Sequence, residues 1–155
     1  MHKCDTHKKC SPSAIRKAEQ ICKDRELRFT DLRRKVLEII WASRKPTKAY
    51  DILDKLKDMD YSAKPPTVYR TLDFLIEHGF IHKLESLNAY IGCSHPGEQH
   101  ECYFLICSEC REIKECCDRA LNEAIAKATR KNKFSPQHTT LEINGKCSNC
   151  MKKII

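Results

Sequence analysis

Two Cys-x-x-Cys pairs have the residue types and spacing that point most directly to chemistry: Cys107 with Cys110, and Cys147 with Cys150. Four thiolates about 2.3 Å from one ion complete a tetrahedral zinc site, and a site closed by four protein ligands is structural rather than catalytic. The usual gap between such pairs is roughly 15–20 residues. Residues 111–146 form a longer gap, in which we expect a helix and a strand. A redox dithiol and a disulfide are the alternatives, although two pairs argue against a single catalytic dithiol.

A second group of potential metal ligands is scattered along the chain. One thiol, two imidazoles and a carboxylate suit four-coordinate zinc, whereas octahedral iron or manganese needs more oxygen donors. Taken singly, each has an ordinary alternative as a surface or core histidine, a small buried cysteine or a solvated carboxylate. The predicted set is His82, Cys93, His100 and Glu115. Rival ligands that spacing does not exclude are His95, Cys102, Cys116, Cys117 and His138.

The composition limits the class of protein. A chain of 155 residues forms one domain or two small ones, and small domains have thin cores that a metal ion can reinforce. The chain is 41% hydrophobic and 32% charged, which excludes extended disorder as the main state. The 29 basic residues outnumber the 21 acidic ones, and the net charge of +8 favours polyanionic partners without proving one.

The sequence contains no recognisable secretory signal or membrane span. The start, Met1-His-Lys-Cys-Asp5, leads into polar residues rather than an apolar segment. No apolar run approaches the ~18 residues of a membrane helix. We therefore expect a cytoplasmic protein without a membrane partner. In that compartment the eleven cysteines stay reduced, and clustered ones hold metal rather than form disulfides.

Four helical patterns fill residues 11–79. Each combines a capping residue or proline with apolar residues three or four positions apart, which predicts an amphipathic helix. Gly79 stands in the C′ position that ends the fourth pattern. The predicted buried face of the fourth helix comprises Val68, Leu72, Leu75 and Ile76. The predicted helix starts are Ser11-Pro12, Thr30, Thr47 and the Lys64-Pro-Pro-Thr67 segment.

Two strand patterns follow these helices, at residues 80–85 and 89–93, and the order of helices followed by a hairpin is that of a winged helix. The pattern then changes, so two domains are expected to meet near residues 86–93. The later predicted elements are strands at 103–107, 111–116 and 139–143 and a helix at 118–131.

The fourth predicted helix carries a polar and aromatic face opposite its apolar one. Thr67, Tyr69 and Arg70 lie in its first turn, the part of a recognition helix that reaches base edges in the major groove. Arg70 can pair bidentately with guanine. Lys64 and Tyr50 are placed to contact the DNA backbone or a neighbouring base. An ordinary solvated helix face is the alternative, and the winged-helix order and positive charge favour DNA.

The run Lys64-Pro-Pro-Thr-Val-Tyr-Arg70, together with the two Cys-x-x-Cys pairs (zinc knuckles), resembles the ferric uptake regulator superfamily over roughly residues 14–150. Within it, Gly79-Phe-Ile-His82 and Tyr90-Ile-Gly-Cys93 resemble the zinc uptake regulator branch. The resemblance implies a homodimeric α+β repressor with an N-terminal winged-helix DNA-binding domain and a C-terminal α/β dimerisation domain with structural zinc. The expected parts are a flexible tail (1–13), the winged helix (14–86), a hinge (87–93) and the dimerisation and metal-binding domain (94–155).

The same resemblance assigns two zinc ions to each chain, a structural one to the four knuckle cysteines and a sensory one to the second ligand set. It also assigns base contacts to Tyr50 and Arg70, with Tyr69 and Lys64 as neighbouring contacts. Iron-type members carry a His-Asp-His cluster before the first knuckle, where this chain has Tyr103 and Phe104. Neither side chain replaces the lost ligands, so the departure favours zinc over iron.

The sequence thus predicts a zinc-responsive repressor that binds palindromic operator DNA as a homodimer when zinc-loaded and controls zinc uptake genes. An iron- or manganese-responsive regulator of the same superfamily is the alternative. A zinc hydrolase or deaminase would need an open coordination position and a nearby general base. A thiol redox protein would need an exposed cysteine of low pKa. We therefore expect no enzyme.

Overall fold

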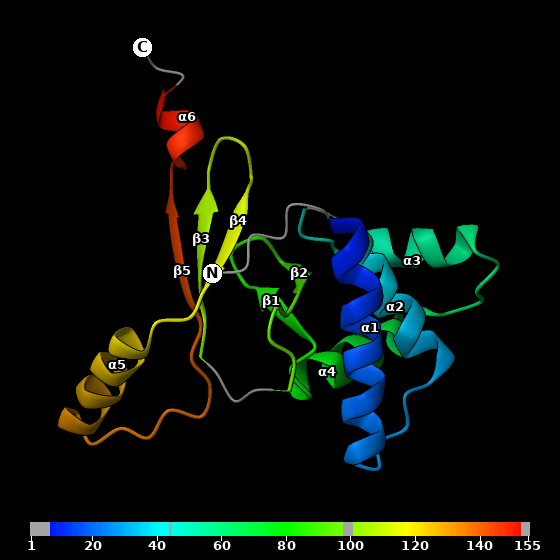
Figure 1. Cartoon of the computed structure of the whole chain (residues 1–155), viewed down its shortest axis with the longest axis horizontal. Coiled ribbons are helices and arrows are strands. Elements are labelled where there is room, and N and C mark those ends of the chain that lie inside the picture. The colour runs from blue at the N-terminus through cyan, green and yellow to red at the C-terminus, as the bar shows by residue number, and fades with distance from the viewer. Residues whose placement is uncertain (1–6, 44, 98–100, 153–155) are drawn as a thin grey trace. The chain divides into compact units, whose positions relative to one another are not determined.

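The computed structural model describes residues 7–43, 45–97 and 101–152. The chain divides into two compact units, Met1–Glu98 and Gln99–Ile155 (Figure 1). Helices dominate the first unit and a small sheet with helices makes up the second, so the predicted α+β class is confirmed.

The first unit consists of four helices followed by an antiparallel hairpin, the order predicted for a winged helix. In the hairpin, Ile81 lies opposite Gly92 and Leu84 lies opposite Ala89. The elements are α1 (His7–Asp24), α2 (Asp31–Ala42), α3 (Ala49–Asp58), α4 (Pro65–Glu77), β1 (Ile81–Leu84) and β2 (Ala89–Gly92).

Helix α1 begins at His7, earlier than the predicted start at Ser11, so part of the predicted tail over residues 1–13 is helical. The segment from His7 to Cys10 contains neither glycine nor proline, so its backbone can continue the helix towards the N-terminus. Pro12 therefore lies inside the helix rather than at its first position. No helix in the described ranges has the length and apolarity needed to cross a membrane.

One predicted N-cap is confirmed and another is wrong. The Thr30 hydroxyl accepts a hydrogen bond from the Arg33 backbone N–H at 3.3 Å, which caps α2. Thr47 does not cap α3, because Lys48 occupies the N-cap position. Thr47 instead exchanges two backbone hydrogen bonds of 2.9 Å with Tyr90 of β2. This pairing joins the segment between α2 and α3 to the hairpin.

Gly79 ends α4 as predicted. Its φ of +75° lies in the left-handed region that glycine adopts without steric cost. The Gly79 N–H donates to the Ile76 carbonyl at 3.0 Å, and the Phe80 N–H donates to the Leu75 carbonyl at 2.8 Å. These two bonds form a Schellman motif, which satisfies carbonyls at the helix end and directs the chain into β1.

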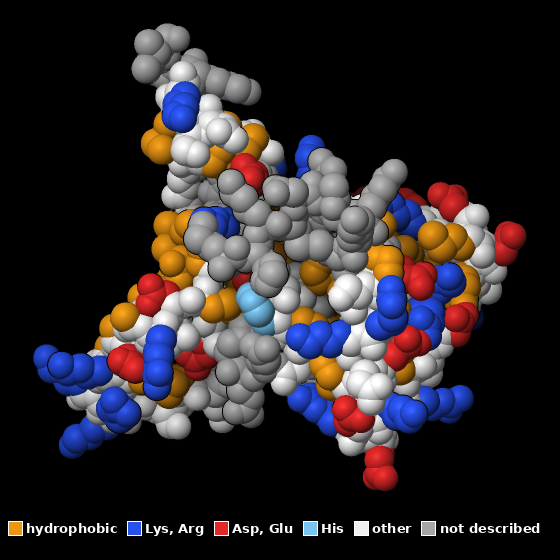
Figure 2. All heavy atoms as spheres, in the orientation of Figure 1, with side chains coloured by type: hydrophobic (Ala, Val, Ile, Leu, Met, Phe, Trp, Pro, Cys, Tyr) orange, Lys and Arg blue, Asp and Glu red, His pale blue; other side chains and the backbone are white. Residues whose placement is uncertain are grey.

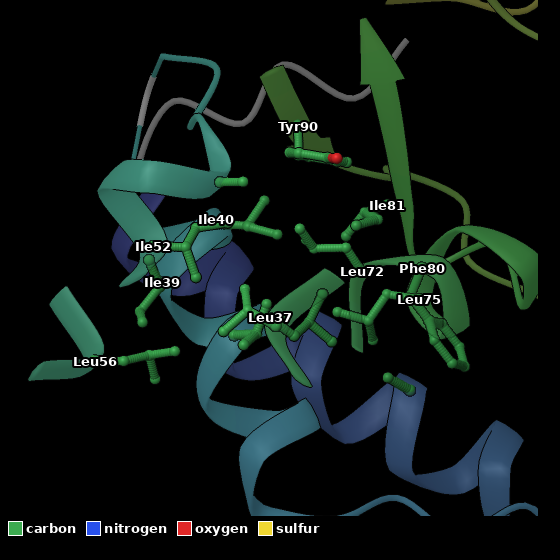
Figure 3. Close-up of a cluster of buried hydrophobic side chains, with 14 of the residues drawn as sticks. Leu37, Ile39, Ile40, Ile52, Leu56, Leu72, Leu75, Phe80, Ile81 and Tyr90 are labelled. Carbon is green, nitrogen blue, oxygen red and sulfur yellow. The ribbon is translucent and has the colours of Figure 1, made fainter. Parts of the chain in front are cut away.

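The hydrophobic core of the first unit lies between the helices and the hairpin. Figure 3 shows Leu37 of α2, Leu72 and Leu75 of α4 and Phe80 grouped in this core. Each is no more than 1% exposed, and burying such a side chain contributes about 1.5–3 kcal/mol. The predicted inner face of α4 is confirmed at three positions, while Ile76 is only partly buried.

The second unit is a three-stranded sheet with two helices. The strand order is β4-β3-β5, with β3 antiparallel to β4 and parallel to β5. Asp118 caps α5, since its carboxylate accepts hydrogen bonds from the N–H groups of Ala120 and Leu121. The elements are β3 (Tyr103–Cys107), β4 (Ile113–Cys116), α5 (Arg119–Lys131), β5 (Leu141–Gly145) and α6 (Ser148–Lys152).

Two boundaries differ from the sequence prediction. β5 begins at Leu141 rather than 139, because it pairs with β3 only from Tyr103 onward. The predicted hinge at 87–93 contains β2, which pairs with β1 inside the first unit, and the division between units falls after Glu98. The functional domain assignment itself stays a prediction.

Candidate metal centre and nucleic-acid interface

The two Cys-x-x-Cys pairs meet at one end of the three-stranded sheet. β3 ends at Cys107, which lies opposite Gly145 in the parallel pairing with β5. Because the second pair directly follows β5, this pairing brings both pairs to the same end of the sheet. The four Sγ atoms all lie within 4.8 Å of one another. This four-cysteine cluster consists of Cys107, Cys110, Cys147 and Cys150.

The geometry of the four-cysteine cluster fits a zinc ion. A tetrahedron with metal–sulfur bonds of about 2.3 Å has sulfur–sulfur edges of about 3.8 Å. The Sγ atoms of Cys110 and Cys147 are 3.6 Å apart. The backbone N–H of Cys147 donates to the Cys107 Sγ at 3.4 Å, and the Ser108 N–H donates to the Gly145 carbonyl at 2.8 Å. These bonds hold the first knuckle against the segment that contains the second.

The four thiols differ in their affinity for protons. Backbone N–H donors, that of Cys147 first, lower the pKa of Cys107 to about 6. A hydrogen bond with the Cys147 sulfur, followed by burial, raises the pKa of Cys150 to about 12. Near neutral pH the metal-free cluster therefore contains both thiolate and thiol. Zinc binding must release the remaining protons, because the thiolate is the ligand.

Two predicted sensory ligands lie together in the first unit. His82 is half-buried on β1, and Cys93 follows β2 with 0% exposure. The Cys93 backbone N–H donates to the Phe80 carbonyl at 3.0 Å, which extends the hairpin by one residue. An imidazole nitrogen of His82 and the Cys93 Sγ are within 4.8 Å of each other. A nitrogen and a sulfur at this distance are suited to bind one zinc ion.

The other two predicted sensory ligands belong to the second unit. Glu115 is half-buried on β4, where it lies opposite Phe104 of β3. His100 lies outside the described residues. The complete set of four sensory ligands therefore stays a prediction.

The predicted DNA contacts all lie on the surface of the first unit. Thr67, Tyr69 and Arg70 are exposed near the start of α4, and Lys64 is exposed at its N-cap. Tyr50, in the first turn of α3, is 72% exposed, and Tyr69 is 50% exposed. Exposed tyrosine, lysine and arginine side chains are suited to contact phosphates and base edges.

Basic and acidic side chains are intermixed over the helices of the first unit on the face that Figure 2 presents. The net charge of +8 is therefore not gathered into one patch on this face.

Cys102 and Cys117 form a disulfide, contrary to the expectation that the cysteines stay reduced. The two residues stand one step beyond the paired residues Tyr103 and Cys116 of the antiparallel ladder. Their Cα atoms are 4.4 Å apart, a distance that a disulfide can bridge. The strand register alone creates this proximity. Without the register, the sequence places both residues only among the rival ligands.

Two of the rival ligands, His138 and Cys116, lie apart from the groups of potential metal ligands in the described residues. His138 is exposed and shares a 2.9 Å hydrogen bond with the Thr140 hydroxyl, and the Cys116 Sγ lies 3.9 Å from the Lys114 carbonyl. Neither His138 nor Cys116 joins a group of potential metal ligands in the described part of the chain. Among the N-terminal residues, Cys4 lies outside the described residues, and only the helical backbone is described for His7 and Cys10.

Known proteins similar to this chain agree on one family. The model of the ferric uptake regulator family matches residues 24–144. The zinc uptake regulation protein of Escherichia coli (strain K12) is 39% identical over 140 residues, which cover 89% of this chain and 81% of that protein. The crystal structure of holo XcZur has a TM-score of 0.84 and 42% identity, covering 90% of this chain and 98% of its own. A zinc uptake regulator complexed with zinc and DNA has a TM-score of 0.85 and 37% identity, covering 93% and 97%.

Proposed function

Because this chain belongs to the ferric uptake regulator family, we propose that it is a zinc-responsive transcriptional repressor. In this proposal it binds palindromic operator DNA as a homodimer when zinc-loaded and thereby controls genes for zinc uptake. The observation that carries the proposal is the pair formed by His82 and Cys93, which lies in the same unit as the exposed face of α4. Zinc bound to this pair would act directly on the unit that reads DNA. A repressor works where its operator is, so we place the protein in the cytoplasm.

The first of two proposed zinc ions per chain belongs to the four-cysteine cluster. Four sulfur ligands leave no open position for a substrate, so this ion has a structural role. The second unit has a thin apolar core, with Phe104 and Ile106 as its buried large side chains among the described residues. A tetrathiolate ion would join the end of β3 to the segment after β5 and so compensate for the small core.

The second proposed ion is sensory. Its four ligands come equally from the two units, so an ion bound to all four would restrict the orientation of one unit relative to the other. The recognition helices of a dimer must match half-sites about 34–36 Å apart, and a fixed orientation supports that match. To turn DNA binding from mostly off to mostly on, zinc must bind the DNA-binding state more tightly than the inactive state by about 5.5 kcal/mol. Two sensory ions per dimer would each contribute about 2–3 kcal/mol of this difference in binding free energy, which is an ordinary allosteric coupling. The proposed ligands are His82, Cys93, His100 and Glu115.

The exposed face of α4 is the proposed reading surface. Arg70 is suited to bidentate pairing with guanine N7 and O6, and Tyr69 to contact with a thymine methyl group. Thr67 has a hydroxyl in the same first turn. Lys64 and Tyr50 flank this turn and are proposed to contact phosphates or a neighbouring base.

Exposed apolar residues on the second unit support the proposed homodimer. Leu105 and Ile143 are paired in register on β3 and β5, and they are 36% and 46% exposed. Phe134, after α5, is 64% exposed. The edges of the sheet are formed by β4 and β5, which leaves strand edges that a second copy of the chain can cover.

The alternative of an iron- or manganese-responsive regulator finds less support in the donor chemistry. Sulfur and imidazole donors suit zinc, whereas manganese and ferrous iron prefer sites richer in oxygen. Tyr103 and Phe104 of β3 occupy the stretch before the first knuckle and offer no carboxylate or imidazole. The family consists of transcription regulators, and the proposal accordingly includes no catalytic step.

The test measures zinc content and DNA binding on the same preparations. A palindromic operator would be selected from random duplexes with zinc-loaded protein, and a mild chelator would then remove the exchangeable ion. We expect two zinc ions per chain in the DNA-binding form and one after chelation, with binding restored by zinc alone. Equal binding by stripped and zinc-loaded protein would refute the proposal. Restoration by iron or manganese but not zinc would establish the alternative.

A further inference from the structure

We propose that Cys102 and Cys117 form a reversible thiol switch that supplies or withholds a sulfur ligand beside Glu115. The proposal rests on the proposed function, because Glu115 is one of the sensory ligands assigned above. Two features of the second unit support it. Cys102 and Cys117 are joined by a disulfide, and the Cys117 Sγ lies within 4.8 Å of a Glu115 carboxylate oxygen.

The backbone keeps the two cysteines opposite each other whether or not the bond is closed. β3 and β4 are paired up to Tyr103 and Cys116, and the disulfide joins the next residue on each side. Opening the bond therefore leaves the ladder intact, with both thiols held at closing distance. Cys117 is exposed and Cys102 is half-buried, so an oxidant or a reductant can reach the pair.

The position of Cys117 relative to Glu115 determines what the switch can do. The two residues are two positions apart, and alternate residues of an extended chain point to the same face. In the reduced protein, the Cys117 sulfur is a soft donor of the kind zinc prefers, and because zinc binds four ligands it would take the place of the harder Glu115 carboxylate. In the disulfide the same sulfur is no longer a thiolate and is lost as a ligand. Oxidation thus removes the sulfur donor from this part of the second unit and leaves the carboxylate.

The chemistry balances with hydrogen peroxide as the oxidant. The more exposed Cys117 attacks the peroxide, which forms a sulfenic acid and releases one water. The Cys102 thiol then attacks the sulfenic sulfur, which forms the S–S bond and releases a second water. A cellular dithiol reductant reverses the reaction by thiol–disulfide exchange and becomes oxidised itself. Cytosolic disulfides are commonly transient and redox-sensing, so a cross-strand disulfide in a cytosolic DNA-binding repressor is expected to form and open reversibly.

The first part of the test maps the bond. Full-length zinc-loaded protein is reduced without oxygen, titrated with hydrogen peroxide and alkylated, and its peptides are then identified by mass spectrometry. We expect a peptide linking Cys102 to Cys117 before any zinc leaves the four-cysteine cluster, and its disappearance with dithiothreitol. The Cys116→Ser variant, altered at the neighbouring cysteine, should form the same link. Oxidation of the cluster before the link appears, or a link that dithiothreitol does not open, would overturn the proposal.

The second part of the test distinguishes a role of Cys117 as a zinc ligand from a purely structural role of the disulfide between the strands. Oxidation of the wild type should raise the zinc concentration for half-maximal operator binding by about tenfold. Cys102→Ser retains the Cys117 thiol but cannot form the disulfide, so without peroxide it should match reduced wild type. Cys117→Ser lacks the sulfur and should match oxidised wild type under both conditions.

The outcomes distinguish this inference from the function on which it rests. If the two serine variants behave alike, Cys117 is not a switched ligand. If reduced wild type binds its operator equally well with and without zinc, the proposed function fails. If binding depends on zinc but does not change when the bond forms, only the switch fails.

Discussion

The two compact units of this protein are stabilised by different means. The first has an extensive apolar core, and every large side chain with less than 2% exposure in the described residues belongs to it. The second has Phe104 and Ile106 as its large buried side chains, and α5 buries none of its residues. The second unit therefore depends on cross-links, namely the four-cysteine cluster, the disulfide and, as we propose, a second copy of the chain.

This difference indicates how the two zinc ions that we propose for each chain can have opposite roles. Removing a metal from a unit with a thin core unfolds that unit, so the ion cannot serve as an exchangeable signal. His82 and Cys93 lie in the unit with the large core, and we expect that core to keep the unit folded without metal. An ion bound there can leave and return, and the protein can respond without unfolding.

The largest effect is expected from Cys147→Ser, which breaks the four-cysteine cluster. Structural zinc sites in small peptides contribute about 10–16 kcal/mol of folding free energy, so the second unit should lose most of its structure while the first stays folded. Amide hydrogen exchange, read separately for the two units, measures this. Cys116→Ser is the matched control and should retain both structure and zinc. Protection of β3 and β5 in Cys147→Ser at the wild-type level would show that the cluster does not stabilise the second unit.

Leu72→Ala tests whether the first unit is stabilised by its apolar core rather than by metal. Leu72 is 0% exposed in the core of the first unit, and removing such a side chain costs about 2–5 kcal/mol. Denaturant unfolding should show this loss with zinc bound, and added zinc should not offset it. Met59→Ala, at a side chain that is 50% exposed, should change stability by about 0.5 kcal/mol or less. A loss in Leu72→Ala as small as in the control would contradict the assignment of a large core.

Cys93→Ser should separate sensing from folding. The variant should keep the zinc of the four-cysteine cluster and its dimeric state, yet lose about 2–3 kcal/mol of zinc-dependent operator affinity for each sensory ion. Gel shifts at buffered zinc concentrations, with zinc content measured in parallel, provide the readout. His82→Ala should give the same result, which would exclude a packing defect at the buried position 93 as the cause. Wild-type zinc dependence in both variants would remove this pair from the sensory site.

The smallest effect is expected from Arg70→Ala, on the surface of the well-packed unit. It should leave stability unchanged and relax base preference at one operator position by about 1–3 kcal/mol. Arg70→Lys keeps the charge but loses the bidentate geometry, so it should lose the same preference while retaining more overall affinity. Binding to a panel of operators, each substituted at one position, measures the change. An equal loss on every operator would make Arg70 a phosphate contact.

Much of the fold could be predicted because its signals are local. Thr30, Gly79 and the apolar spacing of α4 each act within a few residues, so their structural consequences can be read from the neighbouring sequence. The predicted N-cap role of Thr47 is wrong because its backbone pairs with Tyr90, which is distant in the sequence. The late start of β5 has the same kind of cause, since its first residue is decided by where β3 begins.

The candidate metal site likewise has features that local sequence predicts and features that only strand pairing decides. The two Cys-x-x-Cys pairs are visible in the sequence because each pair is local, and the amino-acid order alone predicts a four-sulfur zinc site. Only the parallel register of β3 with β5 brings the pairs together, and only the antiparallel register of β3 with β4 places Cys102 against Cys117. Short-range spacing determines which residues can bind a metal. Strand pairing, which joins residues far apart in the chain, decides which of them meet.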